Sequence, residues 1–261
     1  YFYMQKKYSI KKILIGRSIL LFRFIKKIVK INYFYVFFNY FNFAKNRIIK
    51  KRSTDYIVID GGTNLLQGFE HLFNSKIINN QFKGYLFEPN PNCIPYIKKR
   101  IKEKKFSDMS LTIEQKALSD MNTTVNLRIE HVPGEHRLQY TDEIIGHGTY
   151  MGGATSILGD EWIKPAWIDD NNFVFEEINT IKTSEFLLSN FEINSYIVCK
   201  LDVEGSEFKI LENLINEDCL KYFNEAYIEW HPQHNSDYSF KDVTNLKKKM
   251  IRKGIYVGFW L

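Results

Sequence analysis

Two acidic residues follow a short apolar stretch in the second half of the chain. Residues 196–201 are predicted to form a buried strand, and Asp202 and Glu204 come just after it. A helix is expected next, because apolar side chains recur at helical spacing at Phe208, Ile210, Leu211, Leu214 and Ile215. In an open α/β sheet, ligands bind outside the carboxyl ends of the strands, so Asp202 and Glu204 are expected to face a ligand crevice. The alternative is an ordinary strand-to-helix turn, in which Ser206 and Glu207 cap the helix.

The first strand-to-helix junction of the chain is rich in glycine. The apolar residues 56–59 lead into Asp60, Gly61, Gly62 and, after one threonine, Asn64. Glycine suits this place because a Cβ atom would keep a cofactor away from the backbone N–H groups at the start of the helix. We therefore expect this junction to bind a cofactor, with a plain tight turn as the alternative. It lacks the G-x-G-x-x-G pattern of dinucleotide-binding enzymes, which argues against a dinucleotide.

Glu88 ends the second predicted strand, in the sequence FEPNP. At that position of a nucleotide-binding α/β fold, a carboxylate can accept hydrogen bonds from both ribose hydroxyls. Glu88 is therefore a candidate for binding the ribose of a cofactor, and a helix-capping acid is the alternative.

Glu229 and His231 are the candidates for proton transfer. They belong to a predicted fifth core strand, 226–230, and the residue just after it, and the two-residue period of a strand puts both on one face. Histidine titrates near neutral pH, so His231 is predicted to take a proton from a hydroxyl substrate; the alternative is a histidine that only bonds backbone. No metal site is predicted, because the spacing of the ligand-type residues between the third and later strands matches no metal motif: His131, Glu135, His136 and His147.

From Tyr56 onward, the pattern alternates between strand and helix. Strands are predicted at 56–59, 84–87, 111–115, 123–129, 173–181, 196–201, 226–230 and 255–261. Helices are predicted up to residue 72, at 91–104, at 183–191, from about 208, and at 240–252. Such alternation is typical of βαβ units and a parallel sheet. Residues 130–172 carry six glycines and are expected to form a long loop of the kind that acts as a lid or binding loop.

The octapeptide KLDVEGSE at 200–207 closely resembles the fourth-strand signature of the FkbM-type S-adenosylmethionine-dependent methyltransferases. The stretch 60–64 and the sequence around Glu88 resemble that family's first and second motifs, although Leu66 stands where the family usually has glycine. Two weaker resemblances add further residues. Residues 115–120, with Ala117 and Asp120, are similar to the family segment near the adenine, where Asp120 equally suits a turn, and 153–158 is similar to a Ser-rich segment.

This resemblance implies a Rossmann-like class I methyltransferase domain, with a mostly parallel, doubly wound sheet, that uses S-adenosylmethionine to methylate hydroxyl groups of sugars or small molecules. In this interpretation Glu88, Ala117, Asp120 and residues 60–64 bind the cofactor. Asp202 faces its methionine end, near the reacting methyl group, and Glu229 or His231 handles the acceptor. The family's sheet ends in an antiparallel hairpin after the fifth strand. This chain has room for one further strand, so we expect that either the last strand is missing or the C-terminus is truncated.

The net charge of +6 is unevenly distributed. Residues 1–52 contain ten Lys, four Arg and no acid, whereas 53–261 hold 22 basic and 30 acidic residues. We therefore predict a basic, aromatic, helical extension over 1–52 and a methyltransferase domain over 53–261. The acidic domain argues against nucleic acid as its substrate, because phosphate contacts need clustered Lys and Arg.

Within the extension, the longest run without charge, 31–44, has fourteen residues and as a helix would reach only about 21 Å. A membrane-spanning helix is therefore not expected. Two alternatives stay open: the segment 8–52 lies on an anionic membrane surface, or it caps the domain. Three cysteines without metal-ligand spacing suit a reducing compartment, so a cytoplasmic protein with peripheral membrane contact is expected. The chain begins with Tyr1, which is typical of a fragment or a processed form.

Two other functions compete with methyl transfer. The first is an NAD-dependent or nucleotide-sugar enzyme on a similar sheet, which the missing dinucleotide fingerprint disfavours. The second is a non-catalytic membrane-surface module, in which the basic extension is the functional part of the chain.

Overall fold

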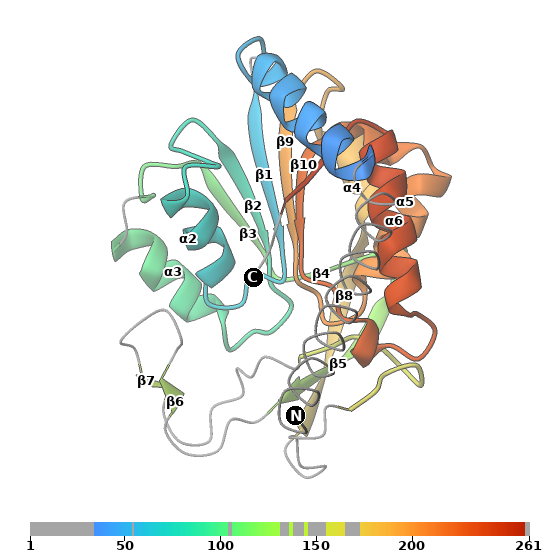
Figure 1. Ribbon diagram of the computed structural model, residues 1–261. Coiled ribbons are helices and arrows are strands. Elements are labelled where there is room, and N and C mark those ends of the chain that lie inside the picture. The colour runs from blue at the N-terminus through green and yellow to red at the C-terminus, as the bar shows by residue number, and fades with distance from the viewer. Residues whose placement is uncertain are drawn as a thin grey trace, which may run out of the picture.

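The computed structural model describes residues 34–53, 55–103, 106–130, 136–137, 144–145, 155–164 and 173–258. Its centre is a six-stranded parallel sheet with the order β11-β10-β9-β1-β2-β3 (Figure 1). The strands are β1 Tyr56–Gly61, β2 Lys83–Phe87, β3 Leu111–Glu114, β9 Tyr196–Leu201, β10 Phe223–Ile228 and β11 Tyr256–Gly258. The predicted α/β fold with a parallel, Rossmann-like sheet is confirmed.

The sheet reverses its order of strand addition between β1 and β9. This is the topological switch point at which open α/β sheets bind ligands. Strand register aligns the carboxyl ends there, since Gly61 pairs with Phe87 on one side and with Leu201 on the other, and Leu201 pairs with Ile228. Side chains that follow these four strands therefore meet at one edge.

Helices cover both faces of the sheet. In Figure 1, α2 and α3 lie on one side and α4, α5 and α6 on the other. Their bounds are α2 Gln67–Asn74, α3 Ile94–Glu103, α4 Thr183–Asn190, α5 Glu207–Asn216 and α6 Phe240–Arg252, with short 3₁₀ turns η1 Cys219–Tyr222 and η2 Pro232–His234. The alternation within a strand explains the two layers: Ile57 and Ile59 pack with the α4–α6 side, and Val58 between them packs with the α2–α3 side.

A second, smaller sheet has the order β4-β8-β5, from β4 Ala117–Ser119, β5 Thr124–Glu130 and β8 Phe173–Lys182. Strand β8 runs parallel to β4 and antiparallel to β5. The sequence pattern predicted β5 and β8 but not that they would form a separate sheet. Within the predicted loop 130–172, β6 His136–Arg137 and β7 Ile144–Ile145 pair as a short antiparallel ladder, and most of that loop's glycines lie outside the described residues.

The basic extension contributes a helix over residues 34–50 that docks on the domain. Three asparagines on one face of it bond to backbone of β10, of β11, of the end of α6 and of the segment between α6 and β11. Asn39 exchanges two hydrogen bonds with Val257, Asn42 donates to the carbonyls of Ile251 and Ile255, and Asn46 donates to the carbonyl of Asn224. Aromatic side chains on this helix, including Phe37 and Tyr40, stay exposed. No helix among the described residues has the length and hydropathy needed to cross a bilayer.

The carboxyl-terminal part of the sheet ends with β11, which pairs in parallel with β10. Residues 259–261 lie outside the described part of the chain, and no strand follows β11 within it. The absence of the family's last strand stays a prediction.

Candidate functional site

A pocket lies at the carboxyl ends of β1, β2, β9 and β10, next to the switch point. The cavity has a volume of about 210 Å³. The walls come from the residues that follow these strands and from the small sheet: Gly62, Asn64, Phe87, Glu88, Pro89, Asn90, Cys93, Ala117, Leu118, Leu127, Thr155, Ile157, Asp202, Val203, Glu204, Ser206 and Glu229. The site therefore forms where the sheet topology of this fold class positions ligands.

Most of the predicted site residues line this pocket, namely Gly62, Asn64, Glu88, Ala117, Asp202 and Glu229. Four others do not. Asp60 is buried beneath the pocket, Gly61 ends β1 between leucine side chains, and Asp120 accepts a hydrogen bond from Ser119 Oγ at 3.1 Å. The ring of His231 lies behind the carboxylates of the wall. Direct cofactor contacts are thus better supported for the six lining residues, and the roles of all ten stay predictions.

A buried lysine joins the first motif to β9. Lys200 Nζ lies 3.2 Å from Asp60 Oδ1 and 3.5 Å from Asp202 Oδ2, and it donates a 2.6 Å hydrogen bond to the Gly62 carbonyl. Burial alone would lower the pKa of Lys200, but the charges of Asp60 and Asp202 outweigh it and raise the pKa. Lys200 therefore stays an ammonium that neutralises Asp60, which explains why Asp60 points into the protein instead of the pocket.

Gly62 makes the contact between these two segments possible. Its φ is +71°, and a Cβ placed on it would lie 1.7 Å from the carbonyl oxygen of Asp202. Only glycine fits where the two backbones approach so closely. The first motif thus serves packing at Gly62 as well as any ligand contact.

Leu66, at the position where the resemblance predicts glycine, adopts the conformation that glycine favours. Its φ is +70°, in the left-handed region, and its side chain is fully buried against the α2–α3 side of the sheet. The left-handed backbone costs a leucine about 1–2 kcal/mol, and burial of the side chain returns about 1.5–3 kcal/mol. Leucine is tolerated at this left-handed position because core packing offsets the backbone cost.

Glu88 is held by backbone amides at the carboxyl end of β2. Its Oε2 accepts the N–H of Asn64 at 2.6 Å and its Oε1 accepts that of Asn90 at 2.8 Å. Burial raises the pKa of Glu88 to about 7, against the opposing effect of these two amides. Each carboxylate oxygen can accept a second hydrogen bond, so the group can still bind a hydroxyl pair from the pocket side.

The turn after β9 places a buried glutamate beside His231. Glu207 Oε2 accepts the Gly205 N–H at 2.9 Å, and its Oε1 accepts the His231 N–H at 2.5 Å. Glu207 therefore caps the turn, as the alternative interpretation expected, and also fixes the segment after β10. Ser206 does not cap: its Oγ makes no capping bond and has no hydrogen-bond partner among the described residues.

His231 differs from its prediction in position and in charge. Strand β10 ends at Ile228, so the strand period does not place Glu229 and His231. His231 Nε2 lies 3.5 Å from Glu229 Oε1, and Nδ1 lies 3.5 Å from Glu207 Oε1. Burial alone would lower the pKa of His231, but Glu207, Glu229 and Glu204 outweigh it and raise the pKa to about 11. The carboxylates around the ring therefore favour its protonated form, and the predicted role of His231 in proton transfer stays a prediction.

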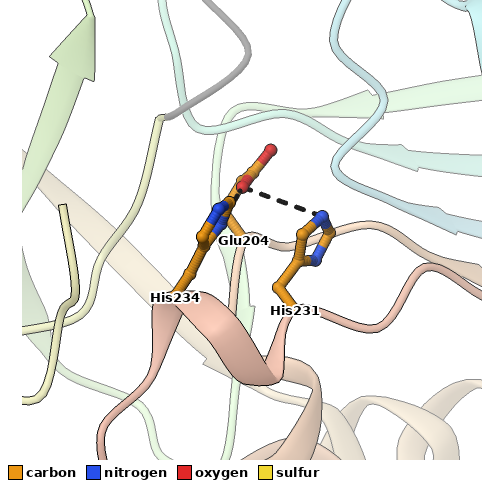
Figure 2. Close-up of side chains that lie close together, drawn as sticks. All are labelled: Glu204, His231 and His234. Atoms are coloured by element: carbon orange, nitrogen blue, oxygen red, sulfur yellow. Dashed lines mark hydrogen bonds and ion pairs between the residues drawn. The ribbon is translucent and has the colours of Figure 1, made fainter. Parts of the chain in front are cut away.

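Sequence reasoning missed His234, which follows His231 by one 3₁₀ turn. Its Nδ1 lies 2.9 Å from Glu204 Oε2, and the two imidazole rings are stacked with centroids 5.2 Å apart (Figure 2). It also missed the ion pair of Lys200 with Asp60 and the bond from the His231 N–H to Glu207. A lysine inside an otherwise apolar strand was the one signal available for a buried ion pair. The histidines and glutamate of the long loop, from which the absence of a metal site was predicted, have side chains outside the described residues.

Comparison with known protein families identifies the family of the chain that forms this pocket. The family model of the methyltransferase FkbM domain matches residues 60–250, most of the chain and all of the strand ends that build the pocket. This chain belongs to the FkbM methyltransferase family. The family predicted from the sequence motifs is thereby confirmed, and methyltransferases of this family use S-adenosylmethionine.

One solved structure is similar to this FkbM-family chain, the methyltransferase FkbM of Methylobacillus flagellatus KT. The two chains are 12% identical with a TM-score of 0.39, and the match covers 75% of this chain and 37% of the other. The chain thus spans well under half the length of that relative. Comparison with curated proteins gave no match.

Proposed function

We propose that this chain is an S-adenosylmethionine-dependent methyltransferase that methylates a hydroxyl group of a small molecule or glycan. The charge of the pocket is the observation that carries this proposal. Glu88, Asp202, Glu204 and Glu229 line it, and none of the described lining residues is Lys or Arg. A cofactor with a cationic sulfur, an ammonium group and two ribose hydroxyls matches such a wall. A dinucleotide with its phosphates does not, since phosphates need cations or free helix N-termini.

The residues present fit that cofactor at three places. Glu88 has acceptor capacity left for the ribose hydroxyls, and Asp202 lies across the pocket for a cationic group. Ala117, Leu118 and Leu127 form an apolar wall that suits a purine ring. The buried Oγ of Ser206, which has no partner within the described chain, is a further group that a ligand would satisfy.

Glu229 is the residue best placed to take the acceptor proton. Its side chain lines the pocket and is 43% exposed, whereas the His231 ring does not line the pocket and lies behind it. When bound, the cofactor supplies a methyl group carried by a cationic sulfur. The sulfur keeps the electron pair of the broken sulfur–methyl bond as the acceptor oxygen gains the methyl group. Glu229 would accept the hydroxyl proton as that oxygen reacts.

The proposal is tested by calorimetric titration of the full chain with S-adenosylmethionine and, in parallel, with NAD. We expect saturable binding of the first and none of the second. Glu88→Gln should weaken that binding at least tenfold, while Glu114→Gln, which alters a partly exposed carboxylate at the end of the neighbouring β3, should not. Incubation with a panel of sugars and small hydroxyl compounds, followed by chromatography for S-adenosylhomocysteine, then identifies the acceptor. Binding of NAD alone would contradict the proposal.

The exposed aromatic face of the helix over 34–50 favours a second role, contact with a membrane surface. Phe37 and Tyr40 are 67% and 73% exposed on this helix, which is fixed to the domain by its asparagine face. Aromatic side chains of this kind, close to basic residues, bind the headgroup region of anionic bilayers.

A further inference from the structure

Two imidazoles and a carboxylate meet beside the pocket, on the side where Asp202 and Glu229 lie. Glu204 comes from the turn after β9, and His231 and His234 flank and end the 3₁₀ turn η2 after β10. Figure 2 shows that both rings present a nitrogen to the same carboxylate of Glu204. Residues 30 positions apart in sequence are thus brought to one point by two adjacent strand ends.

The distances within this cluster are those of ligand atoms around one ion. Glu204 Oε2 lies 2.9 Å from His234 Nδ1 and 3.8 Å from His231 Nε2, and the three ligand atoms all lie within 4.8 Å of one another. Atoms bound at about 2.1 Å to a common ion are about 3.0 Å apart in octahedral sites and about 3.4 Å apart in tetrahedral sites. The observed pairs bracket these values, so small side-chain adjustments suffice.

His231 is oriented as metal-binding histidines usually are. Its side chain is 6% exposed, and its Nδ1 faces Oε1 of the fully buried Glu207 at 3.5 Å. A histidine that binds a metal through one ring nitrogen generally turns the other toward a carboxylate or carbonyl, which fixes the ring. Glu207 lies on that side of the ring, at a distance longer than a normal hydrogen bond, and Nε2 is directed at the cluster.

The space around Nε2 holds oxygen atoms at distances too long for good hydrogen bonds. Besides Glu204 Oε2 at 3.8 Å, Asp202 Oδ1 lies at 4.0 Å and Glu229 Oε1 at 3.5 Å, against about 2.7–3.2 Å for a normal hydrogen bond. Asp202, Glu229 and His231 form a second possible ligand set that shares this nitrogen. Several carboxylates thus surround one imidazole. The nearby Lys200 ammonium contacts Asp202, but it also contacts Asp60.

We propose that Glu204, His231 and His234 bind a divalent first-row transition-metal ion, with Asp202 and Glu229 placed to add an oxygen ligand or hold its water. Imidazole nitrogen with carboxylate suits zinc, iron, cobalt, nickel or manganese, whereas magnesium and calcium prefer oxygen alone. The role of the ion rests on the proposed methyltransferase function: it would bind the acceptor hydroxyl next to Glu229 and lower the pKa of that hydroxyl.

The test is a metal titration of the full chain after dialysis against EDTA, without cofactor or acceptor. Cobalt(II) is followed by its visible absorption bands, and zinc, manganese and magnesium by calorimetry. We expect one tightly bound equivalent of cobalt or zinc and much weaker magnesium binding. His234→Asn and Glu204→Gln should each lower the affinity about 100-fold or more, because each removes a ligand. His71→Asn, a change of an exposed histidine on α2, should leave it unchanged.

Circular dichroism of each variant establishes that it is folded, and His234→Asn is the milder change because that ring is at the edge of the cluster. Absence of saturable binding by the wild-type chain, or equal affinity in His234→Asn and wild type, overturns the proposal. The cluster would then be an imidazolium held by carboxylates. Metal binding without S-adenosylmethionine binding would instead contradict the proposed function and leave the metal site standing. Methyl transfer that is unaffected by EDTA, in a chain that binds no metal, would support the proposed function and contradict the metal site.

Discussion

Glu88 gives the pocket a pH dependence that can be worked out from the structure. Burial raises its pKa from 4.5 to about 7, a shift of about 2.5 units. Between those two values the folded chain keeps a proton that the unfolded chain has released. The contribution of Glu88 to the free energy of unfolding is therefore fully present below pH 4.5 and is lost as the pH rises to about 7. At 1.36 kcal/mol per unit, the loss is about 3 kcal/mol.

Glu88→Gln removes this titration while keeping the side chain's shape. Glutamine has one acceptor oxygen where glutamate has two, so the variant forfeits one of the bonds from Asn64 and Asn90, at a cost of about 1 kcal/mol. That cost is the same at every pH. We therefore predict that the stability of the variant relative to wild type rises by about 3 kcal/mol between pH 4.5 and pH 8.

Urea denaturation monitored by tryptophan fluorescence at several pH values measures this difference. Glu114→Gln, which alters a partly exposed carboxylate on β3, is the control for the loss of a carboxylate elsewhere on the sheet. Cofactor affinity should follow the same group, because a protonated carboxyl binds the ribose hydroxyls poorly: we expect wild type to lose about tenfold between pH 8 and pH 6, beyond any change in Glu88→Gln. A stability difference that is flat across this range would refute the reasoning.

Three further predictions address the supports of the pocket. Lys200→Met leaves Asp60 buried without its cation and should destabilise the fold by about 3–5 kcal/mol in urea denaturation, with much of the loss recovered when Asp60→Asn is added. Gly62→Ala should abolish cofactor binding by calorimetry, whereas Gly159→Ala, where an added Cβ meets only the flexible end of a glutamate side chain, should not. Replacing Phe37 and Tyr40 by Ser should reduce co-sedimentation with anionic vesicles severalfold, in contrast to Phe240→Ser, an equally exposed aromatic on α6.

The sequence predicts the core of this fold well because the central strands are mostly apolar on both faces and acidic residues lie at or just after their carboxyl ends. Strand β9, followed by Asp202, is the clearest case, and the expected bounds of α6 agree with the observed ones. Motifs at the ends of parallel strands converge by topology, so the approximate place of Glu88, Asp202 and Glu229 could be predicted without knowledge of side-chain contacts.

The features of the site that could not be predicted from the sequence depend on contacts between distant segments. The alternating residues after Ile228 resemble more strand, but Glu207 accepts the His231 N–H from 24 positions away and Pro232 begins a 3₁₀ turn. Lys200 and Asp60 pair in register across β9 and β1 although 140 positions separate them. The crowding of carboxylates that raises the pKa of His231, and the approach of His234 to Glu204, follow from the same local turn.

One feature of the docking of the helix over 34–50 could be predicted from the sequence. Asn39, Asn42 and Asn46 lie three and four residues apart and therefore share one helix face, which indicates a polar contact surface within an aromatic segment. The partner of that face, the backbone near β11, lies more than 200 residues away and could not be predicted.

Calorimetric titration of the wild-type chain and of Asp202→Asn with S-adenosylmethionine tests the acidic pocket most directly. Asp202 contributes a negative charge beside the switch point, and asparagine keeps its size while removing that charge. We predict one binding site per wild-type chain and at least tenfold weaker binding by the variant. Equal affinity of the two chains, or no binding by either, would contradict the conclusion that carboxylates at the strand ends recognise a cationic cofactor.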